Sequence, residues 1–566
     1  MKKYISILLG GLMMASCVDT VLLPDDKTVD EDFWQSKSDV SMMVNGAYSK
    51  MTGADVISKL IVWGGFRSDE LCINASANTA QDNISQNLLK IQEVNIETTN
   101  AFSAWAPVYS VINNCNIVLK KAEPVMSIDP NYTNGDYETD RSQMLALRAL
   151  CYFYLVRTFR DVPYTTTAYM NSSQDMTIRQ LSPDSVLINC IADLEEAEKN
   201  ALSAAASGWQ RVGWINKEAI HSILADIYLW RASVMHNPED YKKCVEYCDK
   251  VIESKRANHV QGPMETVVKE YPLYNANEAY NEIFINMNSE ESIFELQSGN
   301  NSGLCSYYFK YKDNNSTYGY LRASSIFGTT GTSSVYASGN DFRYWMNTFD
   351  VGSGAGSFDV RKMIAQNTYN ALPTKGIARE LRQFANFRQN FIIYRLTDIM
   401  LMKAEAMTQL AVDKADPILR SAFNIVQYVN NRSYDEAAKS DSLKWNTYAD
   451  VQRMEELILA ERLRELCFEG KRWYDLLRYN YRHVEGVDYT TTLADMEAAG
   501  TPLPKNHNAM LDLIGRKYTE GAAARKAKMR SEANLYMPIP RSDTDVCDWL
   551  KQNPAYSDND QFTQND

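Results

Sequence analysis

The chain has 566 residues, of which 45% are apolar, and a formal net charge of −13. It is long enough to bury a large hydrophobic core, and no Pro/Gly/Ser-rich linker divides it. Because its basic residues form no stripe that would attract phosphates, we expect no nucleic-acid partner.

The first residues have the pattern of a secretory signal peptide. Two lysines precede an apolar run over residues 4–14, and two small residues stand directly before Cys17. The run of about eleven residues is too short to span a bilayer, which takes roughly 20. The tetrapeptide Met-Ala-Ser-Cys resembles a bacterial lipobox, so we expect removal of residues 1–16 and lipidation of Cys17.

Residues 17–30 are predicted to be a lipidated tether, because they combine turn formers and charges without any periodicity. A helix follows from about residue 37. Trp34 stands just before it and has two interpretations, stacking on a sugar or stapling the helix to the core. We favour the staple.

Apolar residues recur at helical spacing through five further segments, which are residues 102–123, 141–164, 182–202, 216–235 and 238–255. Such a succession indicates stacked helical hairpins of the kind found in TPR arrays. Cys244 and Cys248 lie one turn apart and could share a metal, but in a chain with five histidines a core-facing pair is favoured, and no metal is assigned. Residues 71–100 are expected to form an extended surface loop.

Residues 257–389 differ from the rest in being rich in Tyr, Asn, Ser and Gly. Short apolar runs at 282–287 and 292–297 suit strands. Helical patterning then returns over residues 391–411.

The segment from Leu457 to Tyr479 carries an apolar stripe interleaved with many charges. Acids and bases stand three or four positions apart, so we expect them mostly to pair with one another. Gly470 is predicted either to cap a helix in the left-handed conformation or to admit a neighbouring backbone. Glu465 and Glu469 could be an acid/base pair, but the neighbouring arginines favour two ionised, structural carboxylates.

Five motifs in this chain, in the expected order, resemble the SusD/RagB family of surface glycan-binding lipoproteins from Bacteroidetes nutrient-uptake systems. They are DFW…NGAY (32–48), W...Y..I..CN.VL (105–119), RTF.DVP (157–163), ER.REL.FEG.RW.DL.R (461–478) and PIP…QNPAY (538–556). The segment at 391–411 is also similar to a family segment, although Leu396 and Thr397 depart slightly from it, and Ala555 stands where glycine is usual.

The resemblance implies a mainly α fold, with a TPR-like frame of helical hairpins around an irregular, loop-rich insertion that contains short strands. A single domain is expected over residues 31–566. The frame would take about 31–256 and 390–480, the ligand-binding insertion 257–389 and a C-terminal segment 481–566.

The resemblance also implies a function. We expect a non-catalytic outer-membrane lipoprotein that faces the cell surface, captures oligosaccharides or polysaccharides and delivers them to a SusC-like TonB-dependent transporter, with no cofactor. Capture of peptides, as in RagB, and glycoside hydrolysis are the alternatives, since the two carboxylates of a hydrolase need not be close in sequence.

The glycan site is predicted in the segment 307–345, because its aromatic residues stand among Asn, Ser and Gly rather than on apolar stripes. Unused aromatic faces can stack on sugar rings, and polar neighbours can bind the hydroxyl groups. The candidate ligand-binding residues are Tyr307, Tyr311, Tyr320, Arg343 and Trp345.

Replacing Cys17 tests the predicted anchor. Cells expressing the wild-type chain should incorporate radiolabelled palmitate into it, and the Cys17→Ser variant should incorporate none, because the acylated thiol is then missing. Equal labelling of both chains would contradict lipidation at Cys17.

Overall fold

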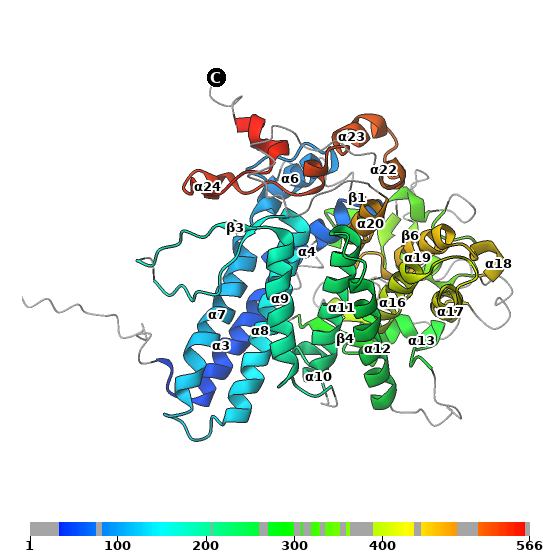
Figure 1. Cartoon of the computed structure of the whole chain (residues 1–566). Coiled ribbons are helices and arrows are strands. Elements are labelled where there is room, and N and C mark those ends of the chain that lie inside the picture. Colours follow the sequence, from blue (N-terminus) through cyan, green and yellow to red (C-terminus); the bar gives the residue numbers. More distant parts are fainter. Residues whose placement is uncertain are drawn as a thin grey trace, which may run out of the picture.

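Long α-helices that pack side by side in successive pairs make up most of the computed structural model (Figure 1). It describes residues 33–74, 82–171, 173–204, 208–259, 270–298, 307–308, 319–328, 334–350, 358–362, 389–434, 443–483 and 508–560. The predicted signal peptide, Cys17 and the tether lie outside these residues.

The frame has two series of packed helices. The first runs through α3 (Lys37–Met51), α4 (Ala54–Ile61), α7 (Ala106–Val125), α8 (Asn134–Phe159), α9 (Pro183–Glu198), α11 (Lys217–Val234) and α12 (Asp240–Asn258). The second comprises α16 (Leu396–Leu410), α17 (Pro417–Arg432), α19 (Val451–Leu466) and α20 (Arg472–Arg482). Packing of α12 on α16 joins the two. The predicted mainly α, TPR-like frame is therefore confirmed.

Helix starts follow the local sequence. The Ser182 side chain accepts a hydrogen bond from the Ser185 amide, and Pro183 occupies the first turn of α9, where no amide donor is needed.

Trp34 is 6% exposed and packs edge to face against Phe33, which agrees with the staple. Cys244 and Cys248 are buried, with their sulfurs 4.0 Å apart.

Strands among the described residues form small antiparallel sheets. β4 (Ser292–Leu296) pairs with β8 (Phe391–Arg395), and β2 (Val162–Pro163) pairs with β3 (Gln180–Leu181). A third sheet has the order β1 (Leu71–Ile73), β5 (Leu321–Ala323), β7 (Phe358–Val360), β6 (Thr348–Asp350). The pairing of β4 with β8 therefore brings a strand from within the predicted insertion 257–389 beside the strand that directly follows it.

Three sequence predictions are corrected by the structure. Residues 71–100 are not one extended loop, because α6 (Asn83–Gln92) forms there and buries Leu88 and Ile91. Residues 282–287 are not a strand, since a π-helix, η3 (Asn281–Asn286), continues α13 (Ala276–Tyr280) and buries Ile283 and Phe284. Residues 391–395 belong to β8, and helix α16 begins only at Leu396.

Most charged residues of α19 and α20 are buried, and many of their partners come from distant segments. Glu465 pairs with Arg343 at 3.1 Å, with Arg395 at 2.7 Å and with Arg432. Burial alone would raise the pKa of Glu465, but these arginines hold it well below its usual range. The expectation that the acids and bases of this segment mostly pair with one another is confirmed only in part. Glu461–Arg464, Arg462–Asp475 and Asp475–Arg478 are such pairs. The other charged residues of the segment pair with distant residues, and these are Glu465, Glu469, Lys471 and Arg472.

Gly470 is left-handed but does not cap α19, which ends at Leu466 with Cys467 as its C-cap, and it does admit a neighbouring backbone. Its φ is +70°, and its Cα lies against the Leu60 carbonyl of α4, where an added Cβ would stand 3.0 Å from the oxygen. From the other side, a Cβ on Gly64 of the π-helix η1 (Val62–Phe66) would lie 1.8 Å from the Gly470 carbonyl oxygen. Two glycines therefore let η1 and the α19–α20 turn meet backbone to backbone.

Next to this contact, Trp473 is 1% exposed, and the Arg67 guanidinium lies 4.3 Å from its ring centroid. Arg67 donates to the carbonyls of Asn534 and Leu535. Asp69, two residues after Arg67, pairs with Arg472 at 2.8 Å.

Replacing Gly64 with alanine should destabilise the protein by about 3 kcal/mol, because backbone atoms cannot yield to the new methyl group. Gly46→Ala is the matched control. Its Cβ would meet only the Asn114 side chain at 3.5 Å, inside α3, where alanine is favoured by roughly 0.5–1 kcal/mol. Thermal unfolding should show a lower midpoint for Gly64→Ala alone. Equal midpoints would contradict the close approach.

Candidate functional site

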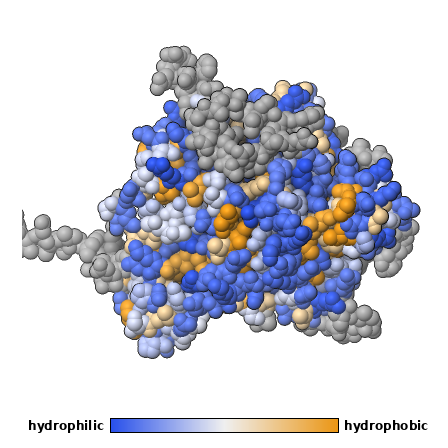
Figure 2. All heavy atoms as spheres, viewed as in Figure 1, coloured by the Kyte–Doolittle hydropathy of each residue, from blue (hydrophilic) through white to orange (hydrophobic). Residues whose placement is uncertain are grey.

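The face of the molecule in Figure 2 is mainly hydrophilic, with hydrophobic residues in separate patches. Scattered patches of this kind are usual on protein surfaces and do not mark a site by themselves. A cavity with polar and apolar walls is a stronger indication of a ligand site.

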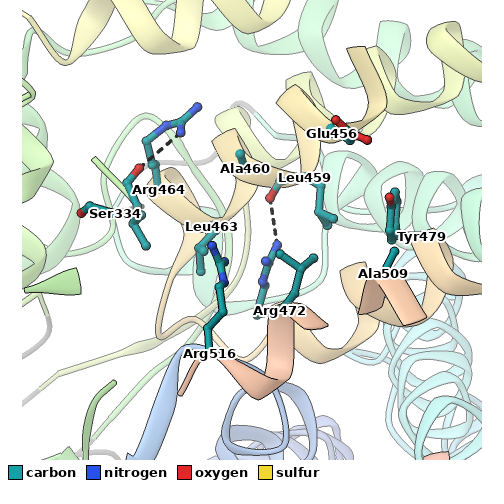
Figure 3. Close-up of a pocket in the computed structure, with 12 residues that line it drawn as sticks. Ser334, Glu456, Leu459, Ala460, Leu463, Arg464, Arg472, Tyr479, Ala509 and Arg516 are labelled. Atoms are coloured by element: carbon teal, nitrogen blue, oxygen red, sulfur yellow. Dashed lines mark hydrogen bonds between the residues drawn. The ribbon is translucent and has the colours of Figure 1, made fainter. Parts of the chain in front are cut away.

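One pocket, of about 320 Å³, lies between α19, α20 and α22 (Asn508–Gly515), close to the segment that begins at residue 334 (Figure 3). Its lining residues come from four separate parts of the chain. They are Ser334, Val335, Glu456, Leu459, Ala460, Leu463, Arg464, Arg472, Tyr479, Ala509, Leu513 and Arg516.

The apolar wall of the pocket has a simple helical origin. Leu459 and Leu463 are four residues apart and so share one face of α19. Across from them, α22 buries Met510, Leu511 and Ile514 in the core and leaves Leu513 partly exposed toward the pocket. The wall is apolar and attached to rigid helices, which suits the C–H face of a ligand.

Three arginines add positive charge to the pocket. Arg464 donates to Glu461 at 2.8 Å and to the Val335 carbonyl at 3.3 Å. Arg472 donates to both oxygens of Asp69, at 2.8 and 2.9 Å, and to the Leu459 carbonyl. Arg516 lies just after α22, and its side chain is 41% exposed.

The predicted ligand residues do not come together at this pocket, and two of them are enclosed. Tyr307 is 7% exposed and packs against Phe102 and Tyr320. Arg343 is also 7% exposed and is held by Asp341, Glu461 and Glu465. The expectation that these side chains are unused is wrong, because each fills a place in the core or in its ion network.

The other candidates keep some access or lie outside the described residues. Tyr320 is half-buried against Tyr307, and Trp345 is half-buried in the short helix α15 (Phe342–Asn347), where Nε1 donates to the Gly339 carbonyl at 2.8 Å. Tyr311 lies outside the described residues. Ligand stacking by Tyr320 and Trp345 stays a prediction.

Trp345 is connected to the pocket through its neighbours. Its ring packs edge to face against Tyr344, with 4.8 Å between the ring centroids, and the centroids of Tyr344 and Tyr336 are 5.8 Å apart. Tyr336 directly follows Val335 of the pocket wall, and its hydroxyl accepts from Asn347, which also donates to the Arg464 carbonyl. The aromatic segment and the pocket are thus fixed to the same turn of α19.

The titratable groups give little support to acid/base catalysis in this pocket. Glu456 is the only carboxylate among the residues that line it, whereas glycosidases generally use two. Burial raises the pKa of Glu70 to about 8, while Arg472 overcomes the burial of Asp69 and lowers the pKa of that neighbour. Separated pKa values can mark an acid/base pair. Both side chains are fully buried, however, and neither lines the pocket.

Sequence reasoning missed the pocket because its walls are far apart in the chain. The apolar spacing in 508–515 could have predicted α22, but nothing in the sequence indicates that this helix faces α19. Arg516 gave no signal either, since one arginine after a short helix is unremarkable without its neighbours.

Comparisons with known proteins agree with this architecture. Residues 288–556 match the model of the SusD family, and residues 24–229 match a family described as starch-binding and associating with the outer membrane. SusD-like protein P38 of Formosa agariphila is 24% identical over 526 residues, which cover 85% of this chain and 92% of that protein. SusD-like protein P25 of the same organism is 24% identical over 495 residues, covering 79% and 84%.

Solved structures share the fold. A SusD homologue from Bacteroides thetaiotaomicron superposes with a TM-score of 0.64 at 17% identity, covering 92% of this chain and 99% of that one. NanU of Bacteroides fragilis gives a TM-score of 0.62 at 17% identity, covering 94% and 99%.

Replacing Trp345 tests the part of the aromatic segment that remains accessible. Trp345→Ala should weaken binding of a glycan by about 1–2 kcal/mol, through loss of a stacking face, with little change in the thermal midpoint. Trp209→Ala is the control, because Trp209 is 45% exposed and lies outside the predicted segment. If both variants bind as the wild type does, Trp345 does not contact the glycan.

Proposed function

This chain belongs to the SusD/RagB family, and from that premise we propose that it captures oligosaccharides outside the outer membrane and passes them to a SusC-like TonB-dependent transporter. Family members are in general glycan-binding proteins of nutrient capture rather than enzymes. The delivery step, the transporter and the cell-surface orientation belong to the proposal.

The observation that carries the proposal is the pocket between α19, α20 and α22. It combines an apolar wall at Leu459, Leu463 and Leu513 with charged groups at its edges. A sugar ring needs both features, since its C–H face packs on apolar atoms while its hydroxyl groups exchange hydrogen bonds with polar side chains. A pocket of about 320 Å³ falls within the usual range for small-ligand sites.

Anchoring through Cys17 completes the proposal. Among the helices of the described residues, none combines the length and the apolar character that crossing a bilayer requires. The family match describes association with the outer membrane. A lipid on Cys17, followed by the tether 17–30, would hold the folded body close to a transporter in the same membrane.

Filling the pocket tests the function. In a purified chain of residues 18–566, Ala509→Trp should weaken glycan binding at least about ten-fold, because the new ring occupies the space the ligand needs. Ala523→Trp is the matched control. Both alanines are exposed on short C-terminal helices, but Ala523, in α23 (Ala522–Lys528), does not line the pocket.

A glycan array followed by calorimetry on the strongest ligand provides the measurement, with thermal midpoints as the check on folding. Unchanged binding by Ala509→Trp would place the site elsewhere. Binding of peptides but of no glycan would favour the peptide-capturing alternative, and the release of new reducing ends would identify a hydrolase.

A further inference from the structure

Among the described residues, Arg516 has the longest ion pair of the three pocket arginines, since Arg464 and Arg472 lie 2.7 and 2.8 Å from their carboxylates. Its nearest acid is Asp69, with Nη2 3.5 Å from the carboxylate, and its side chain is 41% exposed. Figure 3 shows it extending from the end of α22 toward Arg472 and Leu463. A guanidinium carries five N–H donors, so most of those on Arg516 are available to a ligand in the pocket.

Asp69 is already neutralised by another residue. Arg472 donates to its two oxygens in a bidentate arrangement, at 2.8 and 2.9 Å, and this pair is buried. The fork geometry of such a pair satisfies both charges. Arg516 therefore adds a positive charge to the pocket wall that Asp69 does not cancel.

The remaining charges of the pocket do not cancel it either. Arg464 is paired with Glu461, which lies on the same helix three residues before it. Glu456 is exposed and accepts from Gln452 at 3.2 Å. Glu456 precedes Leu463 by seven residues, which is about 10 Å along the axis of α19. Arg516 approaches α19 near Leu463, so Glu456 lies too far along the helix to pair with it.

We propose that the pocket takes an acidic glycan, with Arg516 binding the carboxylate of a hexuronic acid residue. Two parallel N–H groups of the guanidinium match the two oxygens of a carboxylate, and the sugar ring would then lie over Leu463 and Leu513. The inference rests on the proposed function and names the class of substrate for the same site. In a chain of net charge −13, a pocket cation that shares its carboxylate, Asp69, with Arg472 would also select such a ligand against the overall repulsion.

The test uses pairs of glycans that differ only at the carboxyl group. Oligomers of polygalacturonate, polymannuronate and polyglucuronate are each compared with their carboxyl-reduced, neutral forms, and a sulfated oligosaccharide is added to detect recognition of any anion. Calorimetry at low and at high salt is performed on the wild type, Arg516→Gln, Arg516→Lys and Arg530→Gln. Arg530 is the matched control because it is exposed, near in sequence and absent from the pocket.

We expect at least one uronate to bind more tightly than its reduced form. Arg516→Gln should weaken binding of that uronate by about ten- to one-hundred-fold, as for a lost charge-assisted pair, and remove its salt dependence. Arg516→Lys should recover only part of it, since an ammonium group lacks the planar fork. Arg530→Gln should bind as the wild type does.

Other outcomes separate the two proposals. Neutral glycans bound as tightly as uronates, or uronate binding unaffected by Arg516→Gln, would overturn the inference and leave glycan capture standing. Preference for the sulfated oligosaccharide would overturn the assignment to a carboxylate. Absence of binding to every glycan, acidic or neutral, would instead overturn the proposed function.

Discussion

The structure depends on carboxylates of one helix that are buried and must be neutralised by other segments. Glu461 and Glu465 lie on one face of α19, and Glu469 lies just beyond its end. Their partners are Arg343, Lys362, Arg395, Arg432 and Arg464. A buried charge costs several kcal/mol unless it is paired, and removing one partner leaves the others uncompensated. The network therefore requires that all these segments reach their places together. Since α15, the residues after β7, β8 and α17 each supply one cation, it fixes the loop-rich part of the chain to the helical frame.

The same constraint positions the site. The ion pairs of Glu461 and Glu465 fix how α19 is rotated about its axis. In this rotation Leu459 and Leu463 line the pocket. Arg472 adds a second constraint, because it donates hydrogen bonds to the Asp69 carboxylate and to the Leu459 carbonyl. The close approach of Gly64 to Gly470 sets how near α20 comes to η1. A ligand would thus enter a pocket whose walls are already rigid, which lowers the entropic cost of binding.

Sequence reasoning succeeded where the signal is local and failed where it is not. The left-handed conformation of Gly470 and the burial of Trp34 each follow from a few neighbouring residues. The role of Arg343 does not, because two of its partners are more than a hundred residues away. Polar neighbours made Tyr307 resemble an exposed loop residue, although its ring packs against Phe102, some two hundred positions earlier in the chain. The pocket was not predicted for the same reason, since its walls come from α19, α20 and α22, which only the folded chain brings together.

The separation between network and pocket bears on how one scaffold can serve different ligands. Relatives of about 24% identity align over most of this chain, and structures of 17% identity share its fold. Replacing Arg395 or Arg432 would remove a cation from buried carboxylates, so these positions are tied to the fold. Arg516 is not tied to the fold in this way, because Asp69 remains paired with Arg472 when residue 516 is replaced. A change at this exposed position alters the charge that a ligand meets while the core stays paired. The chemistry of the pocket can therefore vary at little cost to stability, and the class of glycan should be decided by a few residues like Arg516 rather than by the fold.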